Sequence, residues 1–562
     1  MITKINTIRR VLNGAIPFTI HYSLFIILCS LFTMLSSCTL DEAPRDQIPE
    51  EEAYNTPKAI YLNAVASLYN YIGGYADGEG LQGTCRGVYD LQTFGSDEAM
   101  LPIRGGDWYD DGLWEQLYKH KWTADHDVVS NAWSYLYKVV THCNRSLEKI
   151  ESHKDKLEEH TFQEYTAEVR ALRAIYYWYL MDLFGGVPIV TSTQVSMNDI
   201  TQAKRSEVFE FVFNELIDTF LRLPMCRSVE HNEYYGRVTY DVAMFVLAKL
   251  TLNAEIYSDD DWTDNNYPDG KDIKFRIFGD TYNAWEATDL FCSRFDQLGY
   301  TLEDNYPDNF SVRNENSKEN IWVIPMDKDL YSNQQQNLFR SWHYRHAAAF
   351  GFGGENGSCA TLNTLRVFGY NTDEEDIRFL YNYWAGDVYD DNYDPVLDRT
   401  GKQFTYYPDK VELDLSGSPY VETAGARMRK YSVDKNATKD GKLMDNDIVL
   451  FRYADVLLMR AEAKMRNGED GQEDFDRVRR RCNITEQDRK LTPETLLDER
   501  LMELCWEGWR RQDMIRFRKY KSLFEGDAYD TPVDESDGHT TVYPIPNGYL
   551  VQNHHCVQNK GY

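Results

Sequence analysis

The sequence predicts a mainly α-helical protein, built of paired helices with an irregular, loop-rich part between two helical regions. Apolar side chains recur at three- and four-residue spacing over residues 161–183, 205–223 and 240–257, which is the spacing of one helix face. Between residues 259 and 445 the chain is instead dense in Gly, Asn, Asp, Tyr and Pro, and helical periodicity is scarce after Leu298. The contrast predicts a helical scaffold that carries long loops, and loops on rigid scaffolds commonly hold binding function.

The first of these helices has signals for both of its ends. Thr161 and Glu164 fit a capping box, in which the Thr hydroxyl accepts from an amide and the Glu reaches back. Gly185 and Gly186, followed by Pro188, predict its end. Small residues lie among large ones in the later helices, which favours close helix pairs of the tetratricopeptide-like kind, although the full repeat consensus is not visible.

Helices are predicted again near the C-terminus. Asp447 is expected to cap a helix that ends near Gly468, and residues 471–482 are expected to form its partner. Thr492 followed by Pro493 is a good pair of N-cap and first-turn residues, and it predicts a helix that runs to about Lys519.

The N-terminus has the features of a bacterial lipoprotein signal. Basic residues precede an apolar run from Ser23 to Leu35, which is too short to span a bilayer comfortably but has the length of a signal-peptide core. The run ends in Leu35-Ser36-Ser37-Cys38, the pattern of a lipobox. We therefore expect the Cys38 thiol to accept diacylglycerol; the alternative is an ordinary secretion signal with an incidental cysteine.

These observations predict four regions along the chain. Residues 1–37 form the signal peptide, and residues 38–56 form a polar, acidic, lipidated tether. Residues 57–258 form an N-terminal helical part. Residues 259–562 form a C-terminal part with the loop-rich insert and the closing helices.

Charge and cysteine usage exclude several classes of function. The formal net charge of −30 argues against nucleic acid, because neutralising phosphates needs an excess of Lys and Arg. It also argues against broad docking onto anionic lipid. Besides Cys29 and Cys38 there are eight distant cysteines without a CxxC pair, so zinc and redox motifs are absent and buried free thiols are expected.

Catalytic motifs are weak, and no enzyme activity is predicted. Glu499, Glu503 and Glu507 recur every four residues, but acids and bases along one helix more often form ion pairs than act as a catalytic pair. No HExxH or GxSxG occurs. His343 and His346 lack further ligands, so no metal and no cofactor are expected, and whether calcium shapes a loop is left open.

Two aromatic clusters suit a sugar ligand. Sugars present C–H faces that stack on aromatic rings, and their hydroxyls pair with Asp, Asn, Gln and Arg side chains. The alternative is that these rings anchor loops to the core. The candidate glycan-binding residues are Asp107, Trp108, Tyr109, Trp114, Asn333, Gln336, Trp342, Tyr344 and Arg345.

Several segments resemble the SusD/RagB family in the order in which that family has them. Residues 170–188 (RALRAIYYWYLMDLFGGVP) are similar to the family segment LRAxxYFxLxxxFGxVP, and residues 451–462 (FRYADVLLMRAE) to RYAEVLLxxAEA. Residues 499–516 are similar to ERxxELxxEGxRxxDLxR. The ending, from Tyr543-Pro-Ile-Pro to Gln558-Asn-Lys-Gly-Tyr562, resembles IP…QNPGY with Lys560 where Pro is usual. The resemblance covers about residues 39–562.

The resemblance implies a fold, a location and a partner. The fold would be a helical body with four tetratricopeptide-like units and a loop-rich part. The protein would be lipid-anchored in the outer membrane, facing the cell exterior, and would cap a SusC-like TonB-dependent transporter to which it delivers bound oligosaccharide or polysaccharide. No reaction would be catalysed, and no binding residue is carried over from the family.

Three other functions stay open at this point. A relative that binds peptide cargo would share the same scaffold. A helical scaffold that binds only protein would have no exposed aromatic surface and no affinity for sugar. A surface glycoside hydrolase would need two carboxylates that face each other across a cleft, and the sequence does not locate such a pair.

Overall fold

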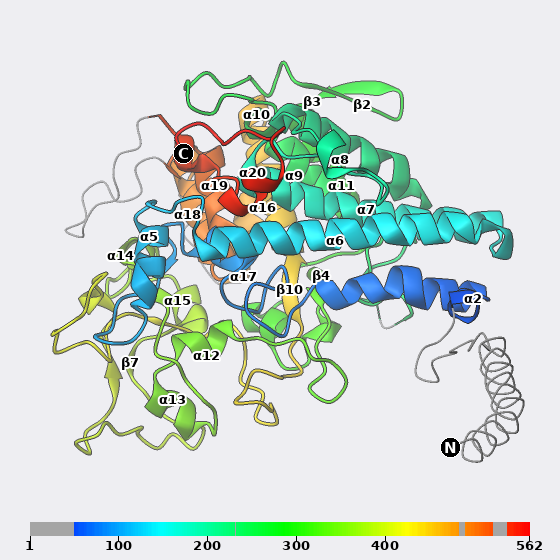
Figure 1. Ribbon diagram of the computed structural model, residues 1–562. Coiled ribbons are helices and arrows are strands. Elements are labelled where there is room, and N and C mark those ends of the chain that lie inside the picture. The colour runs from blue at the N-terminus through cyan, green and yellow to red at the C-terminus, as the bar shows by residue number, and fades with distance from the viewer. Residues whose placement is uncertain (1–49, 231, 483–488, 521–536) are drawn as a thin grey trace, which may run out of the picture. The chain divides into compact units, whose positions relative to one another are not determined.

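The larger part of the protein is a series of helices in which each helix packs against the next. The computed structural model describes residues 50–562 apart from 231, 483–488 and 521–536. In packing order the main helices are α6 (Asp127–Ser152), α7 (Glu159–Phe184), α8 (Arg205–Thr219), α9 (Tyr240–Leu252), α11 (Ala284–Gln297), α16 (Tyr453–Asn467) and α17 (Gln472–Arg481) (Figure 1). Serial stacking of helix pairs is typical of tetratricopeptide-like repeats, so the predicted fold class is confirmed.

Helix α7 lies at the centre of this series. It packs between α6 and α8, and therefore nearly every side chain from Ala167 to Phe184 is buried. The helix ends where predicted, because Gly185 adopts a φ of 70° that favours glycine. The predicted start is wrong: the helix begins at Glu159 after the extended residue Glu158, so Thr161 lies within the first turn and caps nothing.

In the part of the chain that the structure describes, all strands occur in two-stranded antiparallel sheets. The pairs are β1 (Ala99–Met100) with β5 (Cys359–Ala360), β2 (Lys274–Ile277) with β3 (Asp280–Asn283), β4 (Asn320–Ile324) with β10 (Ile448–Arg452), β6 (Tyr383–Trp384) with β9 (Arg427–Met428), and β7 (Gly386–Asp387) with β8 (Thr405–Tyr406). The β4–β10 sheet corrects the prediction for Asp447. Residues 448–452 pair with β4 instead of starting a helix, and Asp447 accepts a hydrogen bond from the amide of Met326 (2.7 Å).

The last predicted helix is in fact two helices. Helix α18 (Pro493–Leu504) begins at the predicted cap Thr492, whose hydroxyl accepts from the amide of Thr495 (3.2 Å). The helix is interrupted after Leu504, because Trp506 and Gly508 adopt positive φ values of 63° and 76°. Helix α19 (Arg510–Arg516) follows. The break buries the Trp506 ring, which is 1% exposed.

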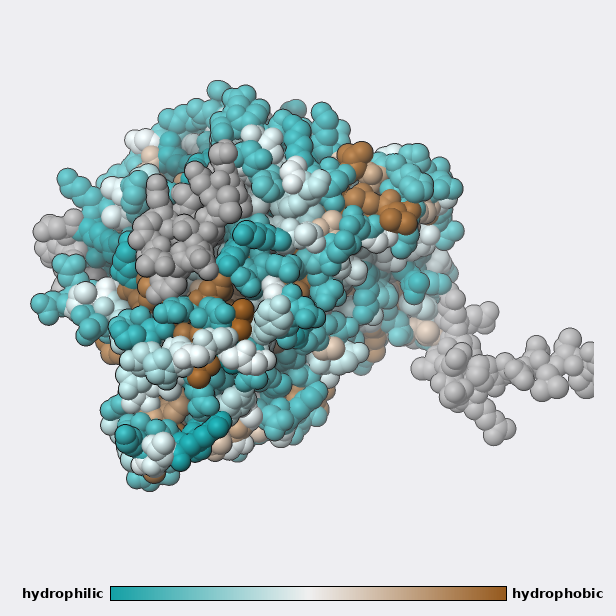
Figure 2. Space-filling view, turned by 60° about the vertical axis from the view of Figure 1, so that its left-hand side comes forward, coloured by the Kyte–Doolittle hydropathy of each residue, from teal (hydrophilic) through white to brown (hydrophobic). Residues whose placement is uncertain are grey.

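Residues 327–445 form the region that we call the loop-rich lobe, in the lower part of Figure 1. Its helices are short: α12 (Asn337–Ser341), α13 (Tyr344–Ala349), α14 (Leu362–Val367) and α15 (Arg378–Asn382). Other short helices are α3 (Pro57–Ile60), α4 (Val88–Thr93), α5 (Leu113–Tyr118), α10 (Ala254–Tyr257) and α20 (Asn547–Gln552). The face in Figure 2 is mostly hydrophilic, with hydrophobic residues in small separate patches. The loop-rich lobe covers the later part of residues 259–445, which the composition predicts to be irregular; in the earlier part, α11 belongs to the helical series.

The chain forms two compact units. Residues Met1–Ala53 form one unit, of which only α2 (Glu50–Ala53) is described, and Tyr54–Tyr562 form the other. The division predicted between residues 258 and 259 falls inside the second unit, where α11 packs on both α9 and α16. The predicted signal peptide, Cys38 and most of the tether lie outside the described residues.

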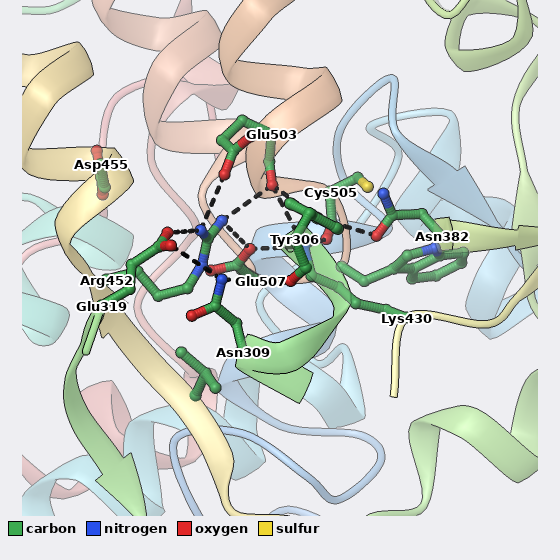
Figure 3. A network of polar contacts seen from close by, with 12 residues as sticks. Tyr306, Asn309, Glu319, Asn382, Lys430, Arg452, Asp455, Glu503, Cys505 and Glu507 are labelled. Carbon is green, nitrogen blue, oxygen red and sulfur yellow. Dashed lines mark hydrogen bonds and ion pairs between the residues drawn. The ribbon is translucent and has the colours of Figure 1, made fainter. Parts of the chain in front are cut away.

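The charged residues of α18 and the turn after it form a buried ion-pair network (Figure 3). The carboxylate of Glu503 is fully buried and accepts hydrogen bonds from Arg378 (3.0 Å), Arg452 (2.9 Å) and Arg481. Arg452 also binds Glu507 (2.8 Å). The predicted ion pairs are confirmed, although these arginine partners come from other elements instead of the same helix.

Two further features concern the described residues only. The eight cysteines from Cys85 to Cys556 are free thiols, and all but Cys226 are buried, as expected. No helix in the described part of the chain is both long enough and apolar enough to cross a membrane.

Candidate functional site

A loop with unusual backbone conformations precedes α5. Trp108, Asp110 and Asp111 have φ values of 62°, 41° and 53°, and Gly105 and Gly112 flank them with positive φ. Residues other than glycine rarely adopt positive φ values, and those that do are held in that conformation by their contacts. Such residues are also concentrated at binding sites, which makes this loop a candidate part of a binding site.

Two tryptophans, Trp108 in this loop and Trp114 in the first turn of α5, hold the loop in place. Trp108 Nε1 donates to the carbonyl oxygen of Glu355 (2.9 Å), and Trp114 Nε1 donates to Oδ2 of Asp110 (2.9 Å). The two rings meet edge to face, with their centroids 6.1 Å apart. The loop is therefore anchored to the loop-rich lobe at one end and to α5 at the other.

Arg86 connects this loop to a second one. Its guanidinium binds Asp77 through Nη1 (2.9 Å) and Asp110 through Nη2 (2.7 Å), and it lies 5.6 Å from the centre of the Trp114 ring. Each of the three charged side chains is partly exposed. The exposed rings of Tyr75 and Tyr109 belong to the two loops that this guanidinium bridges.

The third element of the site comes from the loop-rich lobe. The hydroxyl of Tyr344, at the start of α13, donates to Oδ2 of Asp107 (2.7 Å). Partial burial and this hydrogen bond raise the pKa of Tyr344 to about 12, so the hydroxyl stays protonated at physiological pH. The two predicted aromatic clusters therefore meet at one surface.

We call this surface the tyrosine platform. Its tyrosines, Tyr75, Tyr109 and Tyr344, are 59%, 53% and 40% exposed, so each is accessible to a ligand. The surface also includes four polar side chains that the contacts given above hold in place; they are Asp77, Arg86, Asp107 and Asp110.

Several predicted ligand-binding side chains are buried in the structure. Trp114 is 1% exposed, and Trp342 is 0% exposed and donates through Nε1 to the carbonyl oxygen of Met428 (2.8 Å). Gln336 is buried and hydrogen-bonds to Gln334 (3.2 Å). These side chains have the alternative role of anchoring loops to the core.

The remaining candidates lie at or near the platform surface. Asp107, Tyr109 and Tyr344 belong to it, and Trp108 is half-buried beneath it. Arg345 is partly exposed next to Tyr344 and donates to the carbonyl oxygen of Leu397 (3.4 Å). Asn333 is half-buried in the segment whose Gln334 bonds to the backbone of the Tyr75 loop.

The sequence reasoning missed Tyr75, Asp77 and Arg86. A local signal for the first two exists, because Gly73-Gly74-Tyr75-Ala76-Asp77 and Gly105-Gly106-Asp107-Trp108-Tyr109 both combine a glycine pair with an aromatic ring and an acid. No such signal marks Arg86, whose role depends on its bonds to two separate loops.

His343 precedes α13 and His346 lies in its first turn. Burial and the nearby Arg427 and Arg104 lower the pKa of His343 to about 3, and His346 is fully buried against the Trp342 ring. Among the described residues no group of three or more His, Cys, Asp and Glu side chains could hold a metal ion. Surface cavities of about 510 and 460 Å3 lie elsewhere, next to residues 221–226 and between α11 and α16.

The architecture described above is that of a helical repeat scaffold with a loop-rich lobe and an exposed aromatic surface. A family model described as "SusD family" matches residues 310–562, and one described as "Starch-binding associating with outer membrane" matches residues 104–252. The chain belongs to the SusD family.

Individual relatives agree with this assignment. The starch-binding protein SusD of Bacteroides thetaiotaomicron is 26% identical in an alignment of 516 positions that covers 86% of this chain and 87% of that protein. A SusD superfamily protein from Bacteroides vulgatus has the same fold, with a TM-score of 0.69, 18% identity and coverage of 91% and 100% of the two chains. Surface glycan-binding protein A of B. thetaiotaomicron, solved with laminarihexaose, has a TM-score of 0.68, 18% identity and coverage of 90% and 99%.

Proposed function

We propose that this protein is a cell-surface glycan-binding lipoprotein that delivers its ligand to a SusC-like TonB-dependent transporter. One observation carries the proposal: the segments that hold three exposed tyrosines, Tyr75, Tyr109 and Tyr344, are joined by bonds between carboxylates, a guanidinium and a tyrosine hydroxyl. Sugar C–H faces stack on such rings, and sugar hydroxyls can donate to the carboxylates and accept from the guanidinium.

The relatives support a carbohydrate ligand. One is named a starch-binding protein, and the structure of another contains laminarihexaose. The rigid platform adds a physical reason, because a pre-organised surface loses less conformational entropy when it binds. We expect modest affinity, on the order of micromolar to millimolar, since a shallow site buries little ligand surface.

We infer binding without turnover. Glu499 and Glu503 are the candidate carboxylates for acid/base chemistry in the sequence. Both are fully buried, and Arg378 binds both of them (2.6 and 3.0 Å). A glycosidase instead needs two carboxylates on either side of an open cleft.

Affinity electrophoresis tests binding and turnover together. The chain from residue 39 onward would be run in gels that contain single polysaccharides, and the same mixtures would be assayed for released sugars. Retardation by at least one glycan class without product would support the proposal. Retardation by none of a broad panel would refute glycan binding, and released product would show an enzyme.

The anchor is the second part of the proposal. Cys38 would carry the lipid that holds the protein in the outer membrane, facing outward, and acyl chains give the stable anchoring that this role needs. Cys38→Ala should move the protein out of the membrane fraction, and protease added to intact cells should degrade the wild-type protein. A wild-type protein that resists protease in intact cells would contradict the exterior location.

The transporter is the third part. A SusC-like channel is what the family resemblance implies, and we propose that the protein covers such a channel as a lid. Purification of the tagged full-length protein from outer membranes in mild detergent should recover a TonB-dependent transporter in about equal amount. Recovery of the protein alone would contradict a stable complex.

A further inference from the structure

We propose that the ligand of the tyrosine platform is an uncharged glycan, and that the platform rejects glycans that carry uronate or sulfate groups. This inference rests on the proposed function and narrows its ligand class. It follows from how the charges on and around the platform are paired.

The cations near the platform are already bound to protein carboxylates or carbonyls. Arg86 binds Asp77 and Asp110 through separate guanidinium nitrogens. Lys442 binds Glu355 (2.9 Å), the residue whose carbonyl oxygen holds the Trp108 ring. An anionic sugar could use these cations only by displacing a carboxylate that stays close by.

Arg104 is also unavailable to a ligand. It is 4% exposed, and its Nη1 and Nη2 donate to the carbonyl oxygens of Val421 and Ala424 (3.0 Å each). Arg345 follows Tyr344 and already donates weakly to the carbonyl oxygen of Leu397 (3.4 Å), and Arg399, which is close enough to lower the pKa of His343, pairs with Glu422 (3.2 Å). These two arginines can bind hydroxyls, but the acidic side chains of the platform and of the flanking chain outnumber them.

The flanking chain adds negative charge. Residues 386–424, which hold Arg104 and Arg345 through their carbonyl oxygens, contain nine acidic and three basic residues. In the loop itself Asp107 and Asp111 are exposed. A bound uronate or sulfate would therefore meet like charges, whereas each hydroxyl of a neutral sugar could donate to a carboxylate.

Matched polysaccharides test this inference. Amylopectin, laminarin, galactomannan and other neutral glycans would each be compared with a derivative whose primary hydroxyls are oxidised to carboxylates. At low ionic strength, the oxidised derivative of a polysaccharide that binds should have about tenfold or more lower affinity than the unoxidised polysaccharide. Added salt should restore part of the lost affinity, because salt screens exposed charges. Equal or tighter binding of the oxidised form would overturn the inference.

A charge variant separates repulsion from the loss of a hydroxyl contact. In the double variant Asp107→Asn with Asp111→Asn the amide oxygen of residue 107 can still accept from Tyr344, but the negative charge is gone. The ratio of native to oxidised affinity should fall toward one in this variant. It should stay unchanged in Asp304→Asn, whose side chain is fully exposed outside the platform. An unchanged ratio in the double variant would refute the electrostatic cause.

The outcomes keep the two proposals apart. Binding to polyanions only, such as polygalacturonate, would overturn the neutral-glycan inference and leave glycan binding intact. Binding to no neutral or anionic polysaccharide would overturn the proposed function itself.

Discussion

Arg340 and Asp90 form a two-bonded ion pair in which neither side chain is exposed to solvent. Nη1 of Arg340 lies 2.9 Å from Oδ2 of Asp90, and Nη2 lies 2.8 Å from Oδ1. Burial alone would lower the pKa of Arg340, but the Asp90 carboxylate raises it above its ordinary value. Asp90 also accepts from the amide of Arg86 (2.6 Å), so this pair connects the loop-rich lobe to the segment that carries the bridging residue of the platform.

Asp90→Asn should weaken both the fold and ligand binding, although Asp90 does not touch the ligand surface. Removing one charge of a buried pair leaves an uncompensated guanidinium, which costs about 3–5 kcal/mol of unfolding free energy. Urea denaturation and calorimetric titration with glycan would measure the two effects. Asp77→Asn, at the exposed end of the platform, should cost less than about 1 kcal/mol of stability. Equal stability losses in the two variants would contradict the positioning role of the buried pair.

Tyr109→Ala should mainly lower glycan affinity, whereas Trp342→Ala should mainly lower stability. Tyr109 is 53% exposed, so its removal should lower glycan affinity about tenfold and change the unfolding free energy by less than about 0.5 kcal/mol. Trp342 is 0% exposed, and its truncation should cost about 3–5 kcal/mol of stability. Thermal melts and titrations of both variants would decide, and a stable Trp342→Ala protein that has lost only glycan binding would contradict this division.

Glu503→Gln should destabilise the scaffold strongly. Burial would raise the pKa of this carboxyl, but Arg481, Arg452 and Arg378 hold it below its ordinary value. Neutralising it leaves three buried guanidinium groups with one carboxylate fewer, and we expect a loss of about 3–5 kcal/mol of unfolding free energy. Glu494→Gln, at an exposed position of the same helix, is the control and should cost less than about 1 kcal/mol. Similar losses in both variants would mean that the network is not needed for stability.

Glu98 should make stability fall as the pH rises through the neutral range. Burial raises the pKa of this carboxyl from its ordinary 4.5 to about 7, although the Trp506 amide, Lys430 and Arg510 oppose the rise. The folded state therefore favours the protonated form, and this contribution is complete below about pH 4.5, declines up to pH 7 and is lost above it. Gln at position 98 cannot titrate. Across this pH window the wild type should therefore lose up to about 3 kcal/mol more unfolding free energy than the Glu98→Gln variant. Identical pH slopes in denaturant titrations of the two proteins would contradict the assignment.

The helical scaffold could be predicted from the sequence because helical periodicity is a local signal. The paired helices, the end of α7 at Gly185 and the end of α16 at Gly468 all follow from neighbouring residues. Strand β10 was missed for the opposite reason. Its apolar residues run directly into α16, and only pairing with the distant strand β4 makes them extended.

The candidate site was predictable in part. Exposed Tyr109 and buried Trp114 occur in the same short, aromatic-rich sequence segment, so composition alone cannot separate a binding ring from an anchoring ring. The separation comes from tertiary contacts, such as the bond from Trp342 to Met428. Arg86 was missed because its partners, Asp77 and Asp110, lie in two loops that only the folded chain brings together.

The most direct test of the platform as the glycan-binding surface is the affinity of a double variant, Tyr109→Ala with Tyr344→Ala, for the polysaccharide that retards the wild type. Phe278→Ala is the matched control, because Phe278 is 62% exposed at the turn between β2 and β3, which lie at the opposite end of Figure 1 from α13. Isothermal titration should show that the double variant loses about a hundredfold in affinity and keeps its melting temperature, while the control binds like the wild type. A double variant that binds as tightly as the wild type would place the glycan-binding site elsewhere on the protein.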